Sequence, residues 1–228
     1  MVCSRRGKKS FSLAAVATAT ALVLLVPAGP AFAKKPPVTF TGSITCTFTG
    51  TLKFKPALIN TDTPSTTTVT LKGKLRTCSY TQSQSTVVIT KGSIKATATA
   101  PSNNCATDVG PDSRPLPAMD ATVKWKATGG KASPSSIDYS GVSVIPDQET
   151  GYLDLYFPQS GGTSPTTGSF AGSSSPASAS SNQVASILAK ACNPRKHGKP
   201  AKGIKAIAFG VAESTIGTSN AGTITLGS

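Results

Sequence analysis

Residues 38–54 alternate strictly between two classes of side chain. One parity is apolar or glycine and includes Phe40, Ile44 and Cys46, whereas the other is threonine or serine and ends with Lys53. Successive side chains on a β-strand point to opposite faces, so this pattern predicts a strand with one apolar and one hydroxyl-rich face. It indicates an all-β fold and carries no catalytic motif.

The same two-residue period recurs along the chain. Val69, Leu71 and Leu75 share one face of the next predicted strand, while Lys72, Lys74 and Arg76 occupy the other. On the third predicted strand, the inward residues are Val88, Ile94, Ala96 and Ala98. Turn residues separate the segments. The further strands are expected at 67–77, 86–100, 121–128, 137–145, 152–157, 204–212 and 223–226.

Glycines on the inward parity point to the architecture. Gly42, Gly50, Gly73 and Gly92 each lie inside a predicted strand, where glycine marks a bend, a bulge or a close backbone approach. An unbent strand over 38–54 would span about 55 Å, far beyond the usual length. Kinks at Gly42 and Gly50 would let it turn a corner. We therefore expect a bent antiparallel barrel or orthogonal sandwich of about eight to ten strands with one short helix.

The helix is expected after Ser181 or Asn182, either of which could cap its start. Val184, Ile187, Leu188 and Ala191 form an apolar stripe at helical spacing, and Asn193-Pro194 ends it.

A Gly-, Ser-, Thr- and Pro-rich segment, 159–181, precedes this helix and contains Phe170 as its only large apolar residue. The segment after it is too short for an independent core. We interpret 159–181 as a long mobile loop within a single domain, 34–228.

The first 33 residues have the features of a signal peptide. Arg5, Arg6, Lys8 and Lys9 precede an apolar stretch over 11–26, and Ala31-Phe32-Ala33 provides a cleavage site before Lys34. The apolar stretch is shorter than the roughly 20 residues of a membrane span. We expect a secreted protein, extracellular or attached to the cell envelope, with no membrane span after cleavage. An uncleaved anchor is the alternative.

Four cysteines follow the predicted cleavage site: Cys46, Cys78, Cys105 and Cys192. An even number in an exported chain indicates disulfides, for which three connectivities are possible. Nearest pairing, Cys46–Cys78 and Cys105–Cys192, leaves neither loop threaded through the other and is favoured. The closest of these cysteines lie 27 residues apart, which argues against a metal site.

The chain is strongly basic, and loss of 1–33 would leave a net charge of +10 from 19 basic and nine acidic residues. This excess favours anionic partners such as cell-wall polymers, phospholipid surfaces or nucleic acid. Solubility alone is the simpler explanation.

Two sets of cations could bind such a partner. Lys53, Lys72, Lys74, Lys91 and Lys95 would line one sheet surface. A loop over 190–205 without aromatic residues is the second candidate polyanion site, although it could equally be a solvated loop. The absence of aromatics argues against specific recognition of nucleic acid. The loop carries Lys190, Arg195, Lys196, Lys199, Lys202 and Lys205.

No catalytic residue or cofactor is predicted. His197 is the single histidine and lies among cations, and no nucleophile motif accompanies it. Asp138 and Asp154 could face each other across a sheet as a carboxylate pair. Glu149 with Asp147 and Asp154 could hold calcium only weakly, because the spacing lacks an EF-hand loop.

Several segments resemble a group of uncharacterised exported actinobacterial proteins. They are Gly42-Ser-Ile-Thr-Cys46, Leu52-x-Phe54-x-Pro56-Ala-Leu58, Thr68-Val-Thr-Leu-Lys-Gly-Lys-Leu75 with Cys78, Thr167-Gly-Ser-Phe-Ala-Gly172 and Gly222-Thr-Ile-Thr-Leu-Gly227. The resemblance spans the mature chain and implies location and fold, with no activity to transfer.

Three functions remain open on this basis. The first is a secreted, non-catalytic β-protein that binds an anionic or carbohydrate polymer of the cell envelope. The second is a secreted hydrolase that uses paired carboxylates, and the third is a structural surface component. The sequence predicts no particular oligomeric state.

Overall fold

The structure, a computed structural model, describes residues 35–60, 65–81, 86–102, 104–109, 114–157, 163–174, 177–210 and 222–227. The chain divides into two compact units, Met1–Lys34 and Lys35–Ser228, and the described residues all belong to the second. The predicted signal peptide therefore lies outside the described residues. Among those residues, no helix combines the length and apolarity needed to cross a bilayer.

The described residues form a sheet of twelve antiparallel strands. The strands are β1 (Ile44–Leu58), β2 (Thr67–Tyr80), β3 (Val88–Ala100), β4 (Met119–Thr128), β5 (Ser135–Tyr139), β6 (Ser143–Pro146), β7 (Tyr152–Phe157), β8 (Ser164–Gly168), β9 (Gly172–Ser174), β10 (Ala177–Val184), β11 (Ile204–Phe209) and β12 (Gly222–Leu226). The helices are α1 (Cys105–Val109) and α2 (Ala185–Cys192), and η1 (Lys196–Gly198) is a 3₁₀ turn.

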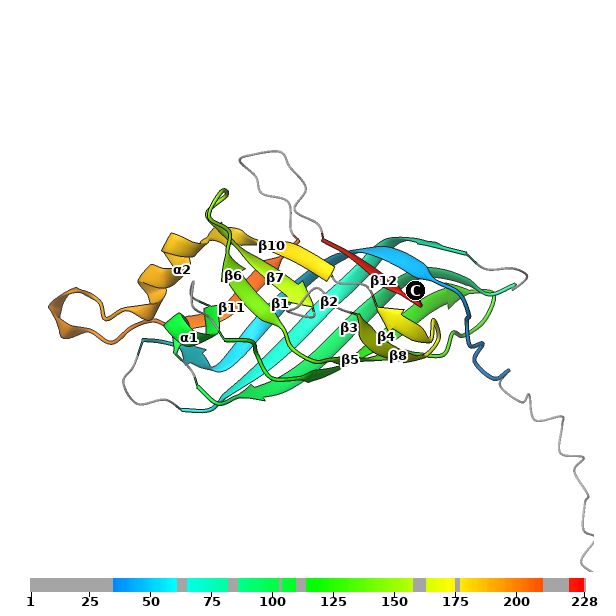
Figure 1. The fold of residues 1–228 in the computed structure, drawn as a ribbon, viewed down its shortest axis with the longest axis horizontal. Helices are drawn as coiled ribbons and strands as arrows, with labels where there is room; N and C mark the ends of the chain where they lie inside the picture. Colours follow the sequence, from blue (N-terminus) through cyan, green and yellow to red (C-terminus); the bar gives the residue numbers. More distant parts are fainter. Residues whose placement is uncertain are drawn as a thin grey trace, which may run out of the picture. The chain divides into compact units, whose positions relative to one another are not determined.

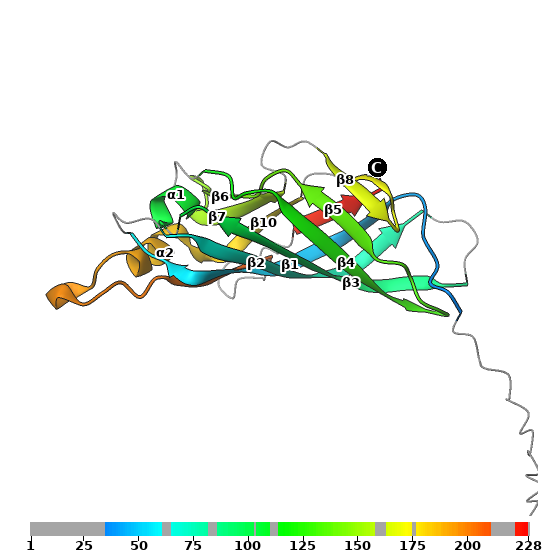
Figure 2. The same ribbon diagram turned by 90° about the horizontal axis from the view of Figure 1, so that it is seen from below.

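Eight of these strands close into an antiparallel barrel, as the sequence predicts. The ring runs β1-β2-β3-β4-β5-β8-β9-β12 and is completed by pairing of β12 with β1. The long strands β1 to β4 form one wall, as Figures 1 and 2 show. Toward α1 and α2, the sheet continues instead through β6, β7, β10 and β11.

Strands β11 and β12 occupy the same position beside β1. Phe209, the last residue of β11, lies opposite Gly50, and Gly222, the first residue of β12, lies opposite Phe48. The two strands thus form one interrupted strand along β1, and β10 pairs with both of them on the other side. This shared position joins the barrel to the additional strands.

The apolar parity of each long strand faces the core, as predicted for β1 and β2. On β3 the prediction for Val88 is wrong, because its side chain is 47% exposed. A register shift against β4 between Ile89 and Lys91 reverses the parity, and Val87 and Ile89 are buried instead. A bulge of this kind cannot be read from alternation alone.

The inward glycines act mainly by admitting aromatic rings. A Cβ atom at Gly50 or Gly73 would lie 2.6 or 2.4 Å from the Phe48 ring, and one at Gly92 would lie 2.9 Å from Trp125. Close packing, rather than a kink, therefore explains Gly50, whose register with β2 is uninterrupted. Gly42 has a φ of +79°, which favours glycine, and the bend there separates residues 38–41 from β1, so the alternating segment is not one continuous strand.

The prediction of one long loop over 159–181 is wrong for its described part, which forms β8, β9 and the start of β10. Phe170 anchors this segment, since it is fully buried and stacks on Phe40 at 5.6 Å between ring centroids. Trp125 contacts it edge-on at 5.5 Å. These strands could not be recognised in the sequence, because Gly, Ser and Thr are also common in loops. Their pairing is short, and their one large apolar residue, Phe170, lies in a turn.

Two other boundaries differ from the predictions. The single strand expected over 137–145 is divided into β5 and β6. The expected helix begins later, at Ala185, because Asn182 and Val184 belong to β10. Val184 pairs with Tyr152 of β7. Val184 is the N-cap and makes no side-chain capping bond. Leu188 and Cys192 are buried, whereas Ile187 of the predicted stripe is 54% exposed. The helix ends at Asn193 as expected.

The two disulfides are Cys46–Cys78 and Cys105–Cys192, which confirms the favoured pairing. The first joins β1 to β2 within the barrel wall, and the second joins α1 to the end of α2. Because disulfides persist in oxidising compartments, they indicate a non-cytoplasmic location.

Candidate anion-binding site

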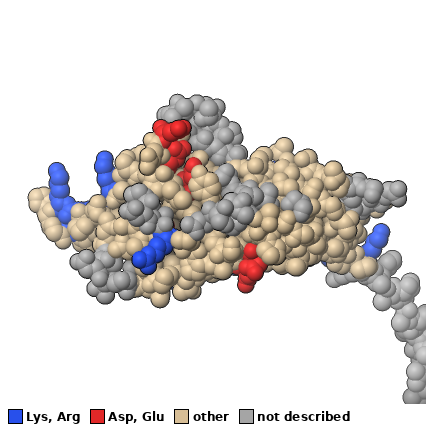
Figure 3. Space-filling view, viewed as in Figure 1, with Lys and Arg blue, Asp and Glu red and all other residues tan. Residues whose placement is uncertain are grey.

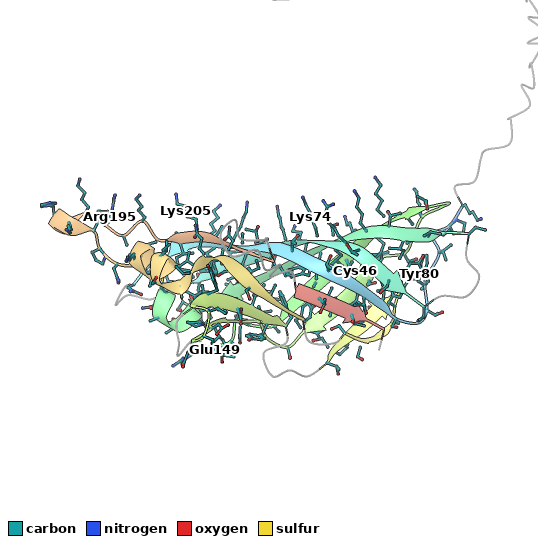
Figure 4. All side chains as sticks on the ribbon, turned by 90° about the horizontal axis from the view of Figure 1, so that it is seen from above. Cys46, Lys74, Tyr80, Glu149, Arg195 and Lys205 are labelled. Carbon is teal, nitrogen blue, oxygen red and sulfur yellow. A yellow bond between two sulfur atoms is a disulfide. The ribbon has the colours of Figure 1, made fainter. Side chains whose placement is uncertain are left out.

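Basic side chains line the outer surface of β11 and β1 to β4. They alternate with buried residues along the strands, so strand geometry alone directs them to solvent. In Figure 4, Lys74 and Lys205 project to one side of the ribbon, and Glu149 lies on the other. We call this set the basic face: Lys53, Lys55, Lys72, Lys74, Arg76, Lys91, Lys95, Lys124, Lys126 and Lys205.

The register of β2, β3 and β4 aligns the cations into rows at the centre of the basic face. Lys95 on β3 lies directly opposite Lys72 on β2. In the next row, Ser93 lies between Lys74 on β2 and Lys124 on β4. Neighbouring strands are about 4.8 Å apart and alternate residues on a strand about 6.7 Å apart. The cations of these three strands therefore crowd into an area of about 10 by 14 Å.

This crowding is repulsive within the protein. Lys72 opposes Lys95, and Lys91 opposes Lys126. Like charges directly opposite each other destabilise a sheet. The other recorded cross-strand partners of the basic face are threonine, serine and alanine. No carboxylate therefore stands directly opposite any of these cations in the described register, and a bound anion would relieve the repulsion.

Acidic side chains of the β6–β7 hairpin lie on the side opposite Lys74, whereas Asp120 points outward from β4 on the same parity as Lys124. Figure 3 shows the side opposite Lys74, where few Lys or Arg are visible and where Asp and Glu side chains lie over the β6–β7 hairpin and, separately, near the lower edge of the view. The acidic residues of this hairpin include Asp147, Glu149 and Asp154. An anionic surface would therefore attract the unit in one preferred orientation.

A shallow hollow of about 410 Å³ lies within the basic face. Ser93 forms its centre, because this small side chain lies among longer lysines. Three strands contribute to the hollow, so it runs across them rather than along them. Its lining is Lys72, Gly73, Ser93, Ile94, Lys95, Thr122 and Lys124.

The six predicted residues of the 190–205 loop are all exposed but are not in one loop. Lys190 lies in the last turn of α2, where a cation interacts favourably with the helix dipole, and Lys205 lies on β11. Arg195, Lys196, Lys199 and Lys202 lie between these elements. We call residues 193–203 the basic arm.

The basic arm is a folded hairpin rather than an irregular loop. The Arg195 backbone N–H donates to the Lys199 carbonyl at 2.8 Å, and its Nε donates to the Pro200 carbonyl at 3.0 Å. At its base, Asn60 Nδ2 donates to Asn193 Oδ1 at 2.6 Å, beside the Cys105–Cys192 disulfide. Arg195 projects to the same side as Lys74 and Lys205 in Figure 4, so the basic arm extends the basic face.

The predicted pairing of Asp138 with Asp154 is wrong, because Asp138 lies opposite Asp120 on β4 and Asp154 lies on β7. Ser180 and Tyr156 donate hydrogen bonds to Asp154 at 2.6 and 3.1 Å. The close pair, Asp120 and Asp138, is exposed, and neither residue lines the hollows described here.

Asp147 supports its own turn rather than a cation site. Its carboxylate accepts hydrogen bonds from the backbone N–H of Glu149 at 2.8 Å and from the Thr150 hydroxyl at 2.8 Å. These bonds, led by that from Thr150, lower the pKa of Asp147. Within the described ranges, no three His, Cys, Asp or Glu residues are grouped to hold a metal. His197 is exposed in η1 with a φ of +63°.

An apolar cavity of about 320 Å³ lies between α1 and α2 and was not anticipated from the sequence. Leu153, Leu188 and Val109 contribute to its lining, together with the Cys105–Cys192 disulfide. Its walls contain no charged side chain, so it offers no means of holding an anion.

Sequence reasoning identified half of the basic face. It missed Lys124 and Lys126, which alternate with Val123 and Trp125 and could have been found from that parity. Lys205 was assigned to the loop although it lies on β11. The opposition of Lys72 and Lys95 depends on register, which no pattern in one strand specifies.

Comparisons with known proteins add nothing to this description, since no family model, curated protein or solved structure matches the chain.

Proposed function

We propose that this protein is an exported, non-enzymatic binding protein that holds an anionic polymer at the cell envelope through its basic face. The observation that carries the proposal is the arrangement of lysines on β2, β3 and β4, in which Lys72 lies directly opposite Lys95 and Lys91 directly opposite Lys126. A sheet that tolerates like charges directly opposite each other gives up stability, and binding of an anion offsets that loss. The basic arm adds charge at one end.

The composition of the basic face favours recognition of charge over recognition of a specific ring. The outward residues from Thr68 to Arg76 on β2 and from Lys91 to Thr99 on β3 are lysine, arginine, threonine and serine. Lysine is a compact point charge that suits phosphate or sulfate without fixing one geometry. Threonine and serine add hydroxyl groups that can donate to or accept from the polymer.

The location supports the same proposal. The disulfides indicate a non-cytoplasmic site, and the predicted signal peptide would deliver the chain across the membrane. Outside the cytoplasm, the abundant polyanions are those of the cell envelope. A protein with a net charge of +10 after cleavage would bind them in competition with salt.

The test measures retention of the purified protein on immobilised polyphosphate, with a neutral glucan as reference, across a range of salt concentrations. Affinity should fall steeply with salt, with a log–log slope of about 0.7–0.9 per anion contacted. The triple variant Lys72→Gln/Lys74→Gln/Lys95→Gln should reduce that slope by about two to three.

The matched control neutralises the same number of charges on the basic arm, as Lys196→Gln/Lys199→Gln/Lys202→Gln. It should reduce the slope less, because these residues are spread along an extension of the basic face. Salt-insensitive retention, or an equal loss from both triple variants, would contradict the proposal.

A further inference from the structure

The apolar cavity between α1 and α2 has a buried floor and an exposed rim. The lining residues that form the floor are buried, namely Val109, Leu153, Leu188, Cys105 and Cys192. The lining residues with polar side chains are all exposed, namely Asn60, Ser186 and Asn193. Hydrogen-bonding side chains of the lining therefore lie only at the rim, where water reaches them.

The walls of the cavity are fixed by bonds between segments that are distant in sequence. The Cys105–Cys192 disulfide joins α1 to α2. At the rim, the Asn60 backbone N–H donates to the Cys192 carbonyl at 2.9 Å, and Asn60 Nδ2 donates to Asn193 Oδ1 at 2.6 Å. A cavity held in this way loses little conformational freedom when a ligand enters it.

The size of the cavity suits a single alkyl chain. Its volume of about 320 Å³ is at the lower end of the range for small-molecule pockets, about 300–1,000 Å³. A methylene group occupies about as much space as a water molecule in the liquid, roughly 30 Å³, so the cavity has room for about ten carbon atoms. An alkyl chain forms no hydrogen bonds, so it leaves none unmade on a floor without polar side chains.

Lys190 places a positive charge at the rim. It lies four residues after Ser186 on α2, so the two side chains share one face of the helix. Side chains on a helix lean toward its N-terminus, and the exposed Lys190 therefore extends toward Ser186. The basic arm adds to this charge. The Gly203 N–H donates to the Ala191 carbonyl at 2.8 Å, which brings Lys202 to the last turn of α2.

Carboxylates near the cavity confine an anion to the side of Lys190. The acidic residues adjacent in sequence to lining residues are Asp108, Asp147 and Asp154. Each accepts a hydrogen bond from a nearby hydroxyl group, and none lines the cavity. They belong to α1 and the β6–β7 hairpin, so an anionic head group is repelled there and attracted to the end of α2.

We propose that this cavity binds the alkyl chain of a free anionic amphiphile, such as a fatty acid or an alkyl phosphate, with its head group outside the cavity at Lys190. A free amphiphile is favoured over a lipid in a bilayer, because insertion requires a broad apolar face. The large apolar side chains that are exposed among the described residues are Val88, Tyr156 and Ile187, and only Ile187 belongs to α1 or α2. This inference goes beyond the proposed function, because the basic face includes neither the cavity nor Lys190.

Calorimetric titration with alkyl phosphates of increasing chain length, each below its critical micelle concentration, tests the cavity. The affinity should rise about fourfold for each added methylene group, because each one buried contributes a similar increment. The rise should end at about ten carbon atoms, when the cavity is filled.

Two phenylalanine variants of α2 test where the alkyl chain lies. Ala189→Phe fills the mouth of the cavity, because Ala189 is exposed and belongs to the lining, whereas Ile187→Phe adds no bulk to the lining. The first should weaken binding of decyl phosphate about tenfold or more, as expected when two or more methylene groups are displaced. The second should leave it unchanged. The emission spectrum of Trp125, which lies on β4, checks that both variants are folded.

The head group is tested by charge. Lys190→Gln should weaken binding of decyl phosphate about two- to fivefold at low salt, as expected for an exposed ion pair, and leave binding of the neutral amphiphile octyl glucoside unchanged. Decyltrimethylammonium has the same alkyl chain and the opposite charge, and it should bind the unaltered protein more weakly than decyl phosphate does.

Each part of the inference has its own contrary result. An affinity that does not depend on chain length, or equal effects of the two phenylalanine variants, would overturn binding in the cavity. Equal affinities for decyltrimethylammonium and decyl phosphate would overturn the choice of an anionic head group. Binding to vesicles of anionic phospholipid, with no binding of free decyl phosphate, would overturn the choice of a free amphiphile. None of these results bears on the proposed function, because no lysine of the basic face is altered.

Discussion

Lys95 illustrates the conflict between stability and binding at a single residue. It extends from the centre of β3, opposite Lys72 on one side and Thr122 on the other. The side chain is exposed, so it could be replaced without disturbing the core. Its charge lowers the stability of the free protein and raises the affinity for a polyanion.

Replacing Lys95 with glutamine should therefore stabilise the unliganded protein. The variant removes the repulsion from Lys72, and the free energy of unfolding should rise by about 0.2–1 kcal/mol at low salt. At 1 M salt the gain should vanish, because the screening length falls to about 3 Å. Urea unfolding at both salt concentrations measures the difference. Lys55→Gln is the control, since Lys55 opposes Thr68. A gain that persists at high salt would refute the electrostatic explanation.

Asp108 is a buried carboxyl group remote from the basic face. Ser102 Oγ donates to its Oδ1 at 3.1 Å, whereas Oδ2 is buried without a hydrogen-bond partner among the described residues. Burial raises the pKa of Asp108 from 3.8 to about 6 despite that hydrogen bond. Above pH 6 the folded protein therefore holds a buried charge that the unfolded chain would solvate.

The sign of the resulting pH dependence follows from this shift. Because the folded pKa is raised, the contribution of Asp108 to stability improves as the pH falls from about 7 to 4. Asp108→Asn should raise the free energy of unfolding by about 1–3 kcal/mol at pH 8, with no gain near pH 4. Denaturant unfolding at the two pH values is the measurement, with exposed Glu149→Gln as control. Equal effects at pH 4 and pH 8 would contradict the assignment.

At the scale of elements, Phe170 decides whether the segment before α2 is a loop or part of the barrel. It is fully buried between Phe40, Tyr80 and Trp125, with ring centroids 5.5 to 6.2 Å away. The Phe170 N–H also donates to the Phe40 carbonyl at 2.8 Å. Strands β8 and β9 are thereby held in the wall of the barrel, between β5 and β12.

Phe170→Ala should accordingly destabilise the protein as a core substitution does. The expected loss is about 3–5 kcal/mol, whereas the same change in a mobile loop would have almost no effect. Thermal and urea unfolding give the value. Tyr156→Ala is the control, since that ring is 37% exposed. A loss below 1 kcal/mol for Phe170→Ala would restore the loop interpretation.

The disulfides act on different elements and should differ in their effects. Loss of Cys105–Cys192, as a double serine variant, should reduce the free energy of unfolding by about 4.5 kcal/mol, since it closes a separation of 87 residues. Loss of Cys46–Cys78, with a separation of 32, should cost about 3.5 kcal/mol.

The basic arm provides a second readout for the disulfides. Only the Cys105–Cys192 variant should speed tryptic cleavage within 193–203, because Cys192 holds the base of the arm. Equal cleavage rates in the two disulfide variants would contradict this anchoring role.

Strong periodicity explains how much of the fold could be predicted. Apolar residues recur at every second position along the long strands β1 to β4. This pattern predicted the strands, the faces that they bury and an all-β barrel or sandwich. The strands β8 to β10 were missed because serine, threonine and glycine also characterise loops. Val88 was placed inward because a bulge leaves no mark in a single sequence.

The sequence predicted which lysines of the candidate site point outward but not how they are arranged across the strands. Alternation placed Lys72, Lys74 and Lys95 outward, and that placement is confirmed. Their opposition across strands depends on register, which is a tertiary property that one strand does not encode.

At the scale of the whole folded unit, the separation of charge directs how it meets a polyanion. The basic face and the acidic β6–β7 hairpin lie on opposite sides, so the field favours one orientation of approach. Contacts should then be confined to the basic face of the protein, even when the polymer is a uniform repeat. If the basic charge served only solubility, a polyanion would contact the lysines of every surface alike. Oriented binding predicts that it contacts those of the basic face.

Lysine labelling in the presence of a polyanion tests that claim directly. The purified protein is treated with an amine-reactive reagent with and without saturating dextran sulfate, and modification is located by mass spectrometry. Lys72, Lys74, Lys95 and Lys124 should be protected, whereas Lys35, which is exposed outside the basic face, should react as before. Uniform protection that includes Lys35, or none at all at saturation, would contradict the account.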